Sequence, residues 1–454
     1  MSDRLVLAID QGTSSTKCLL VDAAGAVVRE ASAPVPIRYP RPGWVEQDAG
    51  EILDSVLVAA ARCLDGVPRG AVAAVGLSTQ RESAVVWDRH TGLPAGPVLG
   101  WQDQRALAVC EGLRKDAEVV RAVSGLPLDP MFSAAKFRWL LDRTPSAAVG
   151  TVDSWLLFAL TGNHQIEVGN ASRTQLLDVR AGRWSEELLD LFGIPAAALP
   201  EITPSNGELG RISERGGVLA GLPITAVLGD SHAALYAHGA GEGDVKATYG
   251  TGSSVMRLGE VAGDAVCLTI AWNDRLAAEG NIRSSGSTVA WLADFLGVSA
   301  AQIGEMARSA ASDGVHLVPG FGGLAAPWWD DTAVGLVSGL TLGTRPEQLA
   351  RAAIESIAHQ VADVVDAMGG AGRILADGGA SENDQLMQIQ ADLTGVPVKR
   401  ARTASLSALG AAFLAGGIAR PLEYDDFEPR PRDPAVRHAW RDAVARARTP
   451  AARS

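Results

Sequence analysis

The stretch LVLAIDQGTSSTKCLLVD, residues 5–22, places a glycine and small hydroxyl residues between two apolar runs. Residues 5–10 and 18–22 are apolar runs of strand length, and the glycine, threonine and serine residues between them are typical of a turn. A hairpin of this kind presents backbone N–H groups and hydroxyls together, which suits phosphate oxygens. The spacing of a Walker A loop is missing, however, and an ordinary polar hairpin explains this segment equally well when it is taken alone.

A second stretch, VKATYGTGSSVMRL at residues 245–258, repeats the pattern of strand, glycine-rich turn and strand. Two such hairpins far apart in the chain predict two related domains that face one another and grip a polyphosphate from both sides. The length agrees, because 454 residues exceed the size at which one hydrophobic core stops growing. We place the domain boundary in the glycine-rich segment YAHGAGEGD, residues 236–244.

The composition is that of an ordinary globular protein, with 47% hydrophobic and 20% charged residues. The net charge of −12 argues against non-specific binding to nucleic acid or to an anionic membrane. No apolar run approaches the ~18 residues of a membrane helix, and the chain enters a strand-like run without a signal peptide. We therefore expect a cytoplasmic protein whose scattered cysteines are buried small hydrophobes in a reducing compartment: Cys18, Cys63, Cys110 and Cys267.

Strand-like and helix-like segments alternate along the chain, which predicts an α/β architecture. Residues 71–79 and 223–229 read as buried strands. Residues 50–64 and 347–367 have apolar positions at helical spacing and read as helices. The end of the chain, AVRHAWRDAVARAR at residues 435–448, is expected to be a solvated terminal helix.

Two further segments place polar or glycine residues where a strand meets a helix. In VLGDSHAAL, residues 227–235, Asp230 follows a buried strand and could be a helix N-cap or a catalytic carboxylate. In ILADGGASENDQLMQIQADL, residues 374–393, a strand meets Gly378 and Gly379 before a helix opens. Such a junction lets a flat ring or a phosphate approach the backbone closely.

A third group of segments, GLSTQRESAVVWD at 76–88 and LGWQDQR at 99–105, puts polar and aromatic side chains at strand ends. This composition is typical of a pocket for a polyhydroxylated ligand, and a surface salt bridge beside a core tryptophan is the alternative. The residues concerned are Gln80, Arg81, Glu82, Trp101 and Asp103.

Taken together, these segments resemble the FGGY carbohydrate kinases, and among them the glycerol kinases most closely. The resemblance runs in collinear order from about residue 4 to about residue 425. The motifs that carry it include DQGTSSTK, PGWVEQD, QRES, VDSWLLFALTG, NASRT, TYGTG, APWWD and DGGASENDQLMQIQAD.

The resemblance implies an α/β fold of two ribonuclease-H-like domains, as in the actin and hexokinase ATPases, with a nucleotide cleft between them. It implies transfer of the γ-phosphoryl group of ATP to a terminal hydroxyl. We expect residues 1–240 to hold the acceptor substrate, the first phosphate hairpin and the catalytic Asp. Residues 241–425 would bind the nucleotide, and residues 426–454 would form a C-terminal tail and helix.

The same resemblance assigns roles to individual residues. Asp230 matches the general base that takes the proton from the acceptor hydroxyl. Asp10 matches the ligand of Mg²⁺, which prefers carboxylate and water oxygens. The expected phosphate contacts are Thr13, Ser14, Ser15, Lys17, Gly250, Thr251 and Gly252, and the expected further nucleotide contacts are Gly286, Gly379 and Asn383.

The acceptor pocket departs from the glycerol-kinase pattern. Arg81, Glu82, Trp101 and Asp230 occupy positions that contact glycerol in that group. Met131 stands where the aromatic residue of DPYFS is usual, Ser254 stands for a phenylalanine, and Ser231 stands for the glutamine after the catalytic Asp. We therefore expect a roomier pocket for a polyol or ketose of four or five carbons. Glycerol is the alternative, if neighbouring residues refill the space.

Other functions and properties stay open on the sequence. A non-catalytic ATP-driven switch of the actin or heat-shock type is the second class, but the acceptor residues and the short tail favour an enzyme. His232 is expected to be structural rather than a proton relay. Gly221 stands where fructose-bisphosphate-inhibited glycerol kinases have an arginine, so we expect no such inhibition. The expected partner is a small polyol or sugar, with no nucleic acid or membrane, and a homodimer is the oligomeric state that we anticipate.

Overall fold

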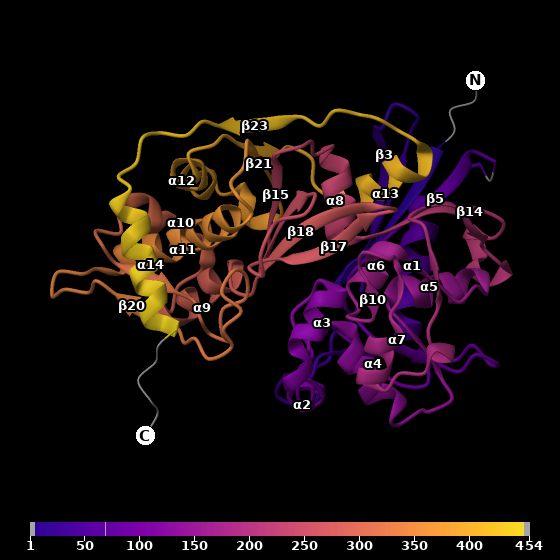
Figure 1. The fold of residues 1–454 in the computed structure, drawn as a ribbon. Coiled ribbons are helices and arrows are strands. Elements are labelled where there is room, and N and C mark those ends of the chain that lie inside the picture. The colour runs from indigo at the N-terminus through magenta and orange to yellow at the C-terminus, as the bar shows by residue number, and fades with distance from the viewer. Residues whose placement is uncertain (1–4, 69, 449–454) are drawn as a thin grey trace. The chain divides into compact units, whose positions relative to one another are not determined.

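The computed structural model describes residues 5–68 and 70–448, which form two compact units (Figure 1). Of these described residues, the first unit comprises 5–68, 70–239, 268–276 and 405–421. The second comprises 240–267, 277–404 and 422–448. Two segments inside the expected second domain, 268–276 and 405–421, therefore belong to the first unit.

The first unit is built on a six-stranded sheet in the order β13-β14-β5-β1-β2-β3. Strands β1, β2 and β3 are antiparallel, whereas β1, β5 and β14 run parallel to one another. The strands are β1 (Leu5–Gln11), β2 (Ser15–Val21), β3 (Val27–Pro34), β5 (Val72–Thr79), β13 (Asn206–Arg211) and β14 (Pro223–Gly229). Because parallel strands end at the same edge, β1, β5 and β14 bring their last residues together.

Helices cover both faces of this sheet. Side chains alternate along β5, so that Val75 and Leu77 join the core formed with α1 (Ala49–Cys63) and α5 (Val152–Thr161). The intervening Gly76 faces α13 (Leu406–Gly416), where an added Cβ would lie 2.3 Å from the Ala411 carbonyl oxygen. Helix α13 also packs along α8 (Asp230–His238).

The chain between β3 and β13 adds shorter elements. The helices are α2 (Leu107–Gly112), α3 (Ala117–Ser124), α4 (Ser133–Leu141), α6 (Val168–Ser172) and α7 (Glu186–Phe192). The short strands are β4 (Glu46–Gln47), β6 (Val85–Trp87), β7 (Val98–Leu99), β8 (Ala148–Gly150), β9 (Gln165–Glu167), β10 (Leu177–Asp178), β11 (Arg183–Trp184) and β12 (Glu201–Thr203).

The second unit repeats the strand order of the first. Strands β18, β16 and β15 are antiparallel neighbours, and β15, β21 and β22 run parallel, so that β18-β16-β15-β21-β22 corresponds to β3-β2-β1-β5-β14. This is the repeated ribonuclease-H-like arrangement that was expected. The strands are β15 (Asp244–Tyr249), β16 (Ser253–Leu258), β17 (Cys267–Trp272), β18 (Arg275–Ile282), β21 (Arg373–Asp377), β22 (Val398–Ala401) and β23 (Tyr424–Phe427).

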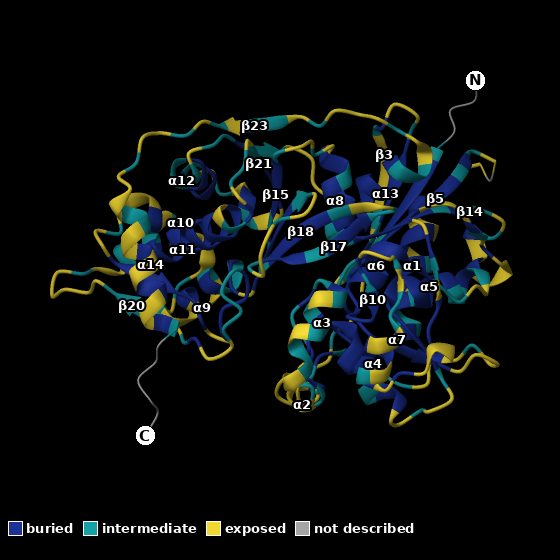
Figure 2. Ribbon diagram, in the orientation of Figure 1, coloured by how far each residue is buried: buried dark blue, intermediate teal, exposed yellow. Residues whose placement is uncertain are grey.

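The largest helix of the second unit is α11 (Pro346–Ala367), which packs against α10 (Ala300–Ser309) and α12 (Asp384–Thr394). The remaining elements are α9 (Gly286–Leu296), β19 (His316–Val318), β20 (Leu336–Ser338) and α14 (Ala435–Arg448). Figure 2 shows the central strands of each sheet buried and the connecting loops exposed.

The expectation of a solvated terminal helix is wrong for α14. Its Trp440 is 1% exposed and stacks on His359 of α11 with ring centres 4.8 Å apart. Arg437 adds an ion pair to the buried Asp363 at 2.7 Å. The helix is therefore packed into the second unit through a narrow apolar stripe, while its arginines dominate the composition.

Two simpler expectations are confirmed for the described residues. All four cysteines are free and buried. Within residues 5–68 and 70–448, each helix is too short or too polar to cross a membrane.

Candidate active site

Two carboxylates gather at the edge of the first unit's sheet where β1 and β14 end. Asp10 accepts a hydrogen bond of 2.9 Å from the Ser78 hydroxyl of the neighbouring strand β5. Burial raises the pKa of Asp10 to about 7, and the negative charge of Asp230 adds to this rise. The sheet topology thus places the predicted metal ligand and the predicted base within electrostatic reach of each other.

Asp230 is the first residue of α8, and it is not the N-cap. The cap residue is Gly229, which makes no side-chain capping bond. The Asp230 side chain is 39% exposed, lies 3.3 Å from the Arg81 Nε, and accepts a 2.6 Å hydrogen bond from the Ser231 N–H. An added Cβ on Gly229 would lie 2.4 Å from the Arg81 Cδ, so glycine is what lets the arginine reach the carboxylate.

Arg81 and Glu82 lie after β5, separated from the end of the strand by Gln80, and are almost fully buried. Glu82 has a φ of +58°, which is uncommon for a residue with a side chain. Its Oε1 lies 2.6 Å from the Nε of Arg173 and 3.8 Å from Nη2 of Arg81. The predicted acceptor residues Arg81, Glu82 and Asp230 are therefore brought together by a chain of ion pairs.

The tip of the first hairpin is held by neighbouring loops. The Gly12 N–H donates to the Ser15 carbonyl across the turn, and the Gln47 amide donates to the Thr13 carbonyl at 2.8 Å. Trp101, another predicted acceptor residue, donates from Nε1 to the Thr13 hydroxyl at 3.3 Å. Ser14 is exposed at the tip.

Lys17 stands opposite Asp10 in the β1–β2 pairing. Its ammonium group donates to the Ser405 hydroxyl at 2.6 Å and lies 3.5 Å from Glu30. Its expected phosphate contact would therefore compete with two partners in its own unit.

Two residues of the proposed polyol pocket have structural partners instead. Asp103 is fully buried, accepts from the Val45 N–H at 2.6 Å and is paired with Arg105 at 2.8 Å. Gln80 is buried and donates to the side chains of Gln11 and Gln47. Nothing in these contacts supports the expected pocket role of Asp103 and Gln80. The alternative, a surface salt bridge, also fails, because the ion pair between Asp103 and Arg105 is buried.

Met131 lies half-buried in the loop before α4. Its N–H donates to the Asp129 carboxylate at 2.7 Å, and its carbonyl accepts from Lys136. Lys136 is fully buried, and burial lowers its pKa to about 8. The buried Lys136 ammonium group therefore fixes the loop that carries Met131 by hydrogen bonds to its backbone.

His232 is fully buried in α8, and its Nε2 lies 3.3 Å from Nη1 of Arg81. It contacts the arginine that holds Asp230. This placement agrees with the structural role that was expected.

In the second unit, the turn between β15 and β16 is tied to the start of α9. The Gly250 N–H donates to the Gly252 carbonyl, and the Gly286 N–H donates to the Gly250 carbonyl, both at 2.9 Å. An added Cβ on Gly252 would lie 2.4 Å from the Ile282 carbonyl oxygen, and one on Gly286 would lie 2.8 Å from the Gly250 carbonyl oxygen. The structure thus brings Gly250, Thr251, Gly252 and Gly286 into one compact backbone cluster.

The glycine pair after β21 lies against this cluster. Gly378 has a φ of +90°, and an added Cβ there would lie 2.5 Å from the Tyr249 carbonyl oxygen. Gly379 faces open space. Asn383 caps α12, because its side chain accepts from the N–H groups of Gln385 and Leu386. The cap uses the Asn383 Oδ1, so the predicted nucleotide contact would be made by the Nδ2 of the same side chain.

Ser254 lies on β16, 9% exposed, with its hydroxyl 3.2 Å from Glu279 Oε1. It belongs to the second unit, whereas Met131 and Ser231 belong to the first.

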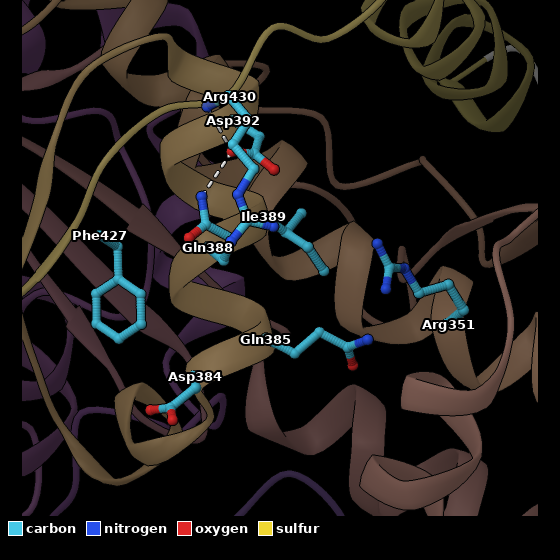
Figure 3. Close-up of a pocket in the computed structure, with 8 residues that line it drawn as sticks. All are labelled: Arg351, Asp384, Gln385, Gln388, Ile389, Asp392, Phe427 and Arg430. Carbon is cyan, nitrogen blue, oxygen red and sulfur yellow. Dashed lines mark hydrogen bonds between the residues drawn. The ribbon is translucent and has the colours of Figure 1, made fainter.

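The second unit also carries a groove with a volume of about 420 Å³ beside α12 (Figure 3). Its polar rim is held together by Asp392, which accepts from the Gln388 amide at 2.7 Å and from the Arg430 N–H at 2.9 Å. The predicted nucleotide residues do not line it. The lining residues are Arg351, Asp384, Gln385, Gln388, Ile389, Asp392, Phe427 and Arg430.

Within the described part of the chain, no group of three or more His, Cys, Asp or Glu side chains forms a ready-made metal site. Sequence reasoning missed two buried cations near the acceptor residues, Arg173 and Lys136. The motif NASRT, which contains Arg173, was recognised, but its arginine received no role because the pairing with Glu82 joins distant parts of the sequence.

Comparison with known proteins identifies the family. The model of the N-terminal domain of the FGGY family of carbohydrate kinases matches residues 5–237, and the model of its C-terminal domain matches residues 245–418. Apulose kinase of Pectobacterium atrosepticum is 42% identical, with 98% of each chain covered. A glycerol kinase of Alkalilimnicola ehrlichii is also 42% identical, with 97% of this chain and 98% of the other covered.

A solved structure of Plasmodium falciparum glycerol kinase with ADP superposes with a TM-score of 0.89 at 27% identity, covering 99% of each chain. The chain described here belongs to the FGGY family of carbohydrate kinases. It is a two-domain α/β kinase, and ATP is the phosphoryl donor that this family implies.

Proposed function

We propose that this kinase phosphorylates a terminal hydroxyl of a four- or five-carbon polyol or ketose. The observation that carries the proposal is the Asp230 carboxylate, which is exposed at the sheet edge and held 3.3 Å from Arg81. A carboxylate in this position can accept the proton of an alcohol while remaining oriented. Phosphoryl transfer needs such orientation and mild base assistance more than a strong nucleophile.

The chain's own residues divide the work as follows. Asp230 takes the proton from the acceptor hydroxyl, and Arg81 fixes the direction of that carboxylate. Arg81 and Glu82 hydrogen-bond the remaining hydroxyls of the acceptor. Trp101, held through the Thr13 hydroxyl, packs against its carbon chain.

Asp10 would hold Mg²⁺ in this scheme. The donor set fits a hard cation, because burial, with the nearby charge of Asp230 adding to it, raises the pKa of Asp10 and leaves a carboxylate that a bound cation would stabilise. The ion would neutralise charge on the phosphates of ATP when bound. The hairpin at Thr13, Ser14 and Ser15 would supply N–H and hydroxyl donors to the same phosphates, with Lys17 released from its partners.

The second unit would bind the rest of the nucleotide. Gly250, Thr251 and Gly252 offer a compact turn to phosphate, and Gly286 lies at the N-terminus of α9, where N–H groups favour an anion. Gly379 faces open space, which allows the flat adenine ring to approach the backbone. Asn383 would contribute its amide to the nucleoside.

The proposed preference for a four- or five-carbon acceptor rests on the residue types at three positions of the expected acceptor pocket, Met131, Ser231 and Ser254. The named relatives do not decide it, because apulose kinase and glycerol kinase are equally similar to this chain. Met131 and Ser231 put a flexible thioether and a small hydroxyl beside the site, and Ser254 replaces an aromatic residue in the second unit. Glycerol remains the second candidate, favoured by the glycerol kinases among the relatives.

The test is ADP release with Mg-ATP across glycerol, erythritol, ribitol, xylitol, D-ribulose and D-xylulose. We expect turnover with a four- or five-carbon acceptor at higher kcat/KM than with glycerol. Asp230→Asn should lower kcat at least about 1,000-fold while ATP binding persists. The matched control is Asp54→Asn on the exposed face of α1, which should leave turnover unchanged. Preference for glycerol over every other acceptor would contradict the substrate proposal.

We further infer that the protein acts in the cytoplasm, which four free buried thiols favour. A homodimer stays a proposal that sedimentation of the purified chain can test.

A further inference from the structure

We propose that Arg173 is a positioning residue for the acceptor substrate, because its ion pair holds the Glu82 carboxylate in the orientation that binds the acceptor. The inference rests on the proposed function, in which Arg81 and Glu82 bind the acceptor hydroxyls. Arg173 directly follows α6 in the motif NASRT.

The contact between the two side chains is short and shielded from water. Arg173 is fully buried, and its Nε lies 2.6 Å from the Glu82 Oε1. Its guanidinium also lies over the ring of Phe132, with the carbon 5.1 Å from the ring centre. Removing the Arg173 cation would leave the buried Glu82 carboxylate with the longer, 3.8 Å contact to Arg81.

The backbone of Glu82 has an unusual conformation that the contact with Arg173 helps to maintain. A φ of +58° is unfavourable for a residue with a Cβ and persists only where the surroundings impose it. The Arg173 contact fixes the far end of the same side chain. We infer that it selects the unusual conformation in which the carboxylate faces the acceptor side.

The ion pair between Arg173 and Glu82 is linked to Asp230, the proposed base, through Arg81. The same Glu82 Oε1 lies 3.8 Å from Nη2 of Arg81, and the Arg81 Nε lies 3.3 Å from Asp230. A displaced Glu82 would therefore alter the Arg81 side chain as well. This arrangement predicts an effect on acceptor binding first and on the chemical step second.

Helix α6 provides a rigid support for Arg173. Both carboxylate oxygens of Glu167 cap its first turn, with 2.8 Å hydrogen bonds from the N–H groups of Gly169 and Asn170. The Asn170 Oδ1 is buried, has no hydrogen-bond partner among the described residues, and lies 3.1 Å from where a Cβ on Gly229 would stand. Helix α6 thus has Arg173, the partner of Glu82, as its C-cap residue, and its Asn170 lies beside Gly229, the residue before Asp230.

The experiment compares Arg173→Gln with Arg105→Gln in the full-length protein. Arg105 is the matched control, because it is also a buried arginine of the first unit paired with carboxylates, Asp103 and Glu46. The probe is whichever of glycerol, erythritol, ribitol or D-ribulose the wild type phosphorylates fastest. We expect Arg173→Gln to raise the acceptor KM about 10-fold or more, with the ATP KM changed less than about 2-fold.

Two further variants separate positioning from folding. Arg173→Lys keeps the charge and should restore part of the acceptor KM, and it remains measurable if Arg173→Gln fails to fold. In a Glu82→Gln background, the effect of Arg173→Gln on acceptor kcat/KM should shrink, because the two residues act through one contact.

Three outcomes would overturn the inference. They are an unchanged acceptor KM in folded Arg173→Gln, an equal change in the Arg105→Gln control, and full additivity with Glu82→Gln. If Arg173→Gln does not fold, a wild-type acceptor KM in Arg173→Lys overturns it. Failure of the proposed function would look different, because the wild type itself would then release no acceptor-dependent ADP.

Discussion

Single residues of the same type take opposite roles in this protein, and their surroundings decide which. Asp103 and Asp230 both pair with an arginine in the first unit. Asp103 is fully buried, with its oxygens used by Arg105 and the Val45 N–H, whereas the Asp230 side chain stays 39% exposed. Only the second carboxylate can meet a substrate. The sequence placed both near a pocket and could not separate them, because exposure depends on long-range packing.

Met131 permits a direct test of the acceptor preference. Met131→Tyr restores an aromatic ring at this position, which should fill space beside the acceptor and favour a smaller one. We expect the ratio of kcat/KM for glycerol to that for ribitol to rise about 10-fold. Met131→Leu is the control, because its similar volume should leave the ratio within about 2-fold. An unchanged ratio in the tyrosine variant would remove Met131 from the specificity argument.

His164 makes stability depend on pH in acid. Burial lowers the pKa of this imidazole to about 4, beside the ring of Trp87 at 5.1 Å. Between pH 6.5 and 4 the unfolded chain therefore binds more protons at this position than the folded chain, so stability falls as the pH falls. We expect a loss of about 1 kcal/mol across this window, reduced from the full shift because the ring is partly exposed.

Urea unfolding at pH 6.5 and 4.5 measures this loss. His164→Gln can keep a hydrogen bond to the Val149 carbonyl without titrating, so it should lose less stability between the two pH values than the wild type. The exposed His90 provides the control, since His90→Gln should keep the wild-type slope. Equal slopes in both variants would show that His164 does not govern this window.

Among the helices and strands, periodicity and turn residues predicted the elements that carry the candidate site. The expected helices at 50–64 and 347–367 are α1 and α11, and both glycine-rich hairpins form as expected. Packing was harder to foresee. The arginines of α14 indicated a solvated helix, yet Trp440 stacks on His359 of α11, and the apolar residues beside it on α14 pack against Val318, Leu324 and Ala333. The few apolar residues on one face of a helix determine how it packs, whereas the composition of the helix averages over both faces.

The turn between β15 and β16 should tolerate no side chain at Gly252. An alanine Cβ would stand 2.4 Å from the Ile282 carbonyl oxygen, and this backbone cannot move without shifting the start of α9. We expect Gly252→Ala to weaken ATP binding at least about 10-fold, as measured by calorimetry. An added Cβ on Gly304 of α10 would lie 4.0 Å from the nearest neighbouring atom, the Arg308 Nη1, so Gly304→Ala should stabilise the protein by up to about 1 kcal/mol with ATP binding unchanged. Wild-type ATP affinity in Gly252→Ala would contradict the assigned role of this turn.

At the scale of the whole molecule, the repeated hairpin correctly indicated a repeated domain. Both sheets have the same central strand order, and the predicted residues gather at strand ends in each unit. The membership of α13 could not be predicted. It follows the second unit's strands in the sequence, yet it packs on β5 and α8 of the first unit. Local pattern shows that a helix forms but carries no information about which sheet receives it.

This arrangement predicts that a change near the C-terminus destabilises the N-terminal unit. An added Cβ at Gly410 of α13 would lie 1.8 Å from the Ala233 carbonyl oxygen of α8. Two packed helix backbones cannot separate locally, so Gly410→Ala should lower the free energy of unfolding by about 2–3 kcal/mol.

Limited proteolysis followed by mass analysis locates this effect. In Gly410→Ala the earliest new cuts should fall within residues 5–239, although the substitution lies far from them in sequence, and Gly304→Ala should give the wild-type pattern. New cuts confined to residues 277–404 would show instead that α13 stabilises the second unit. The location of the first cuts therefore decides which sheet depends on the helix.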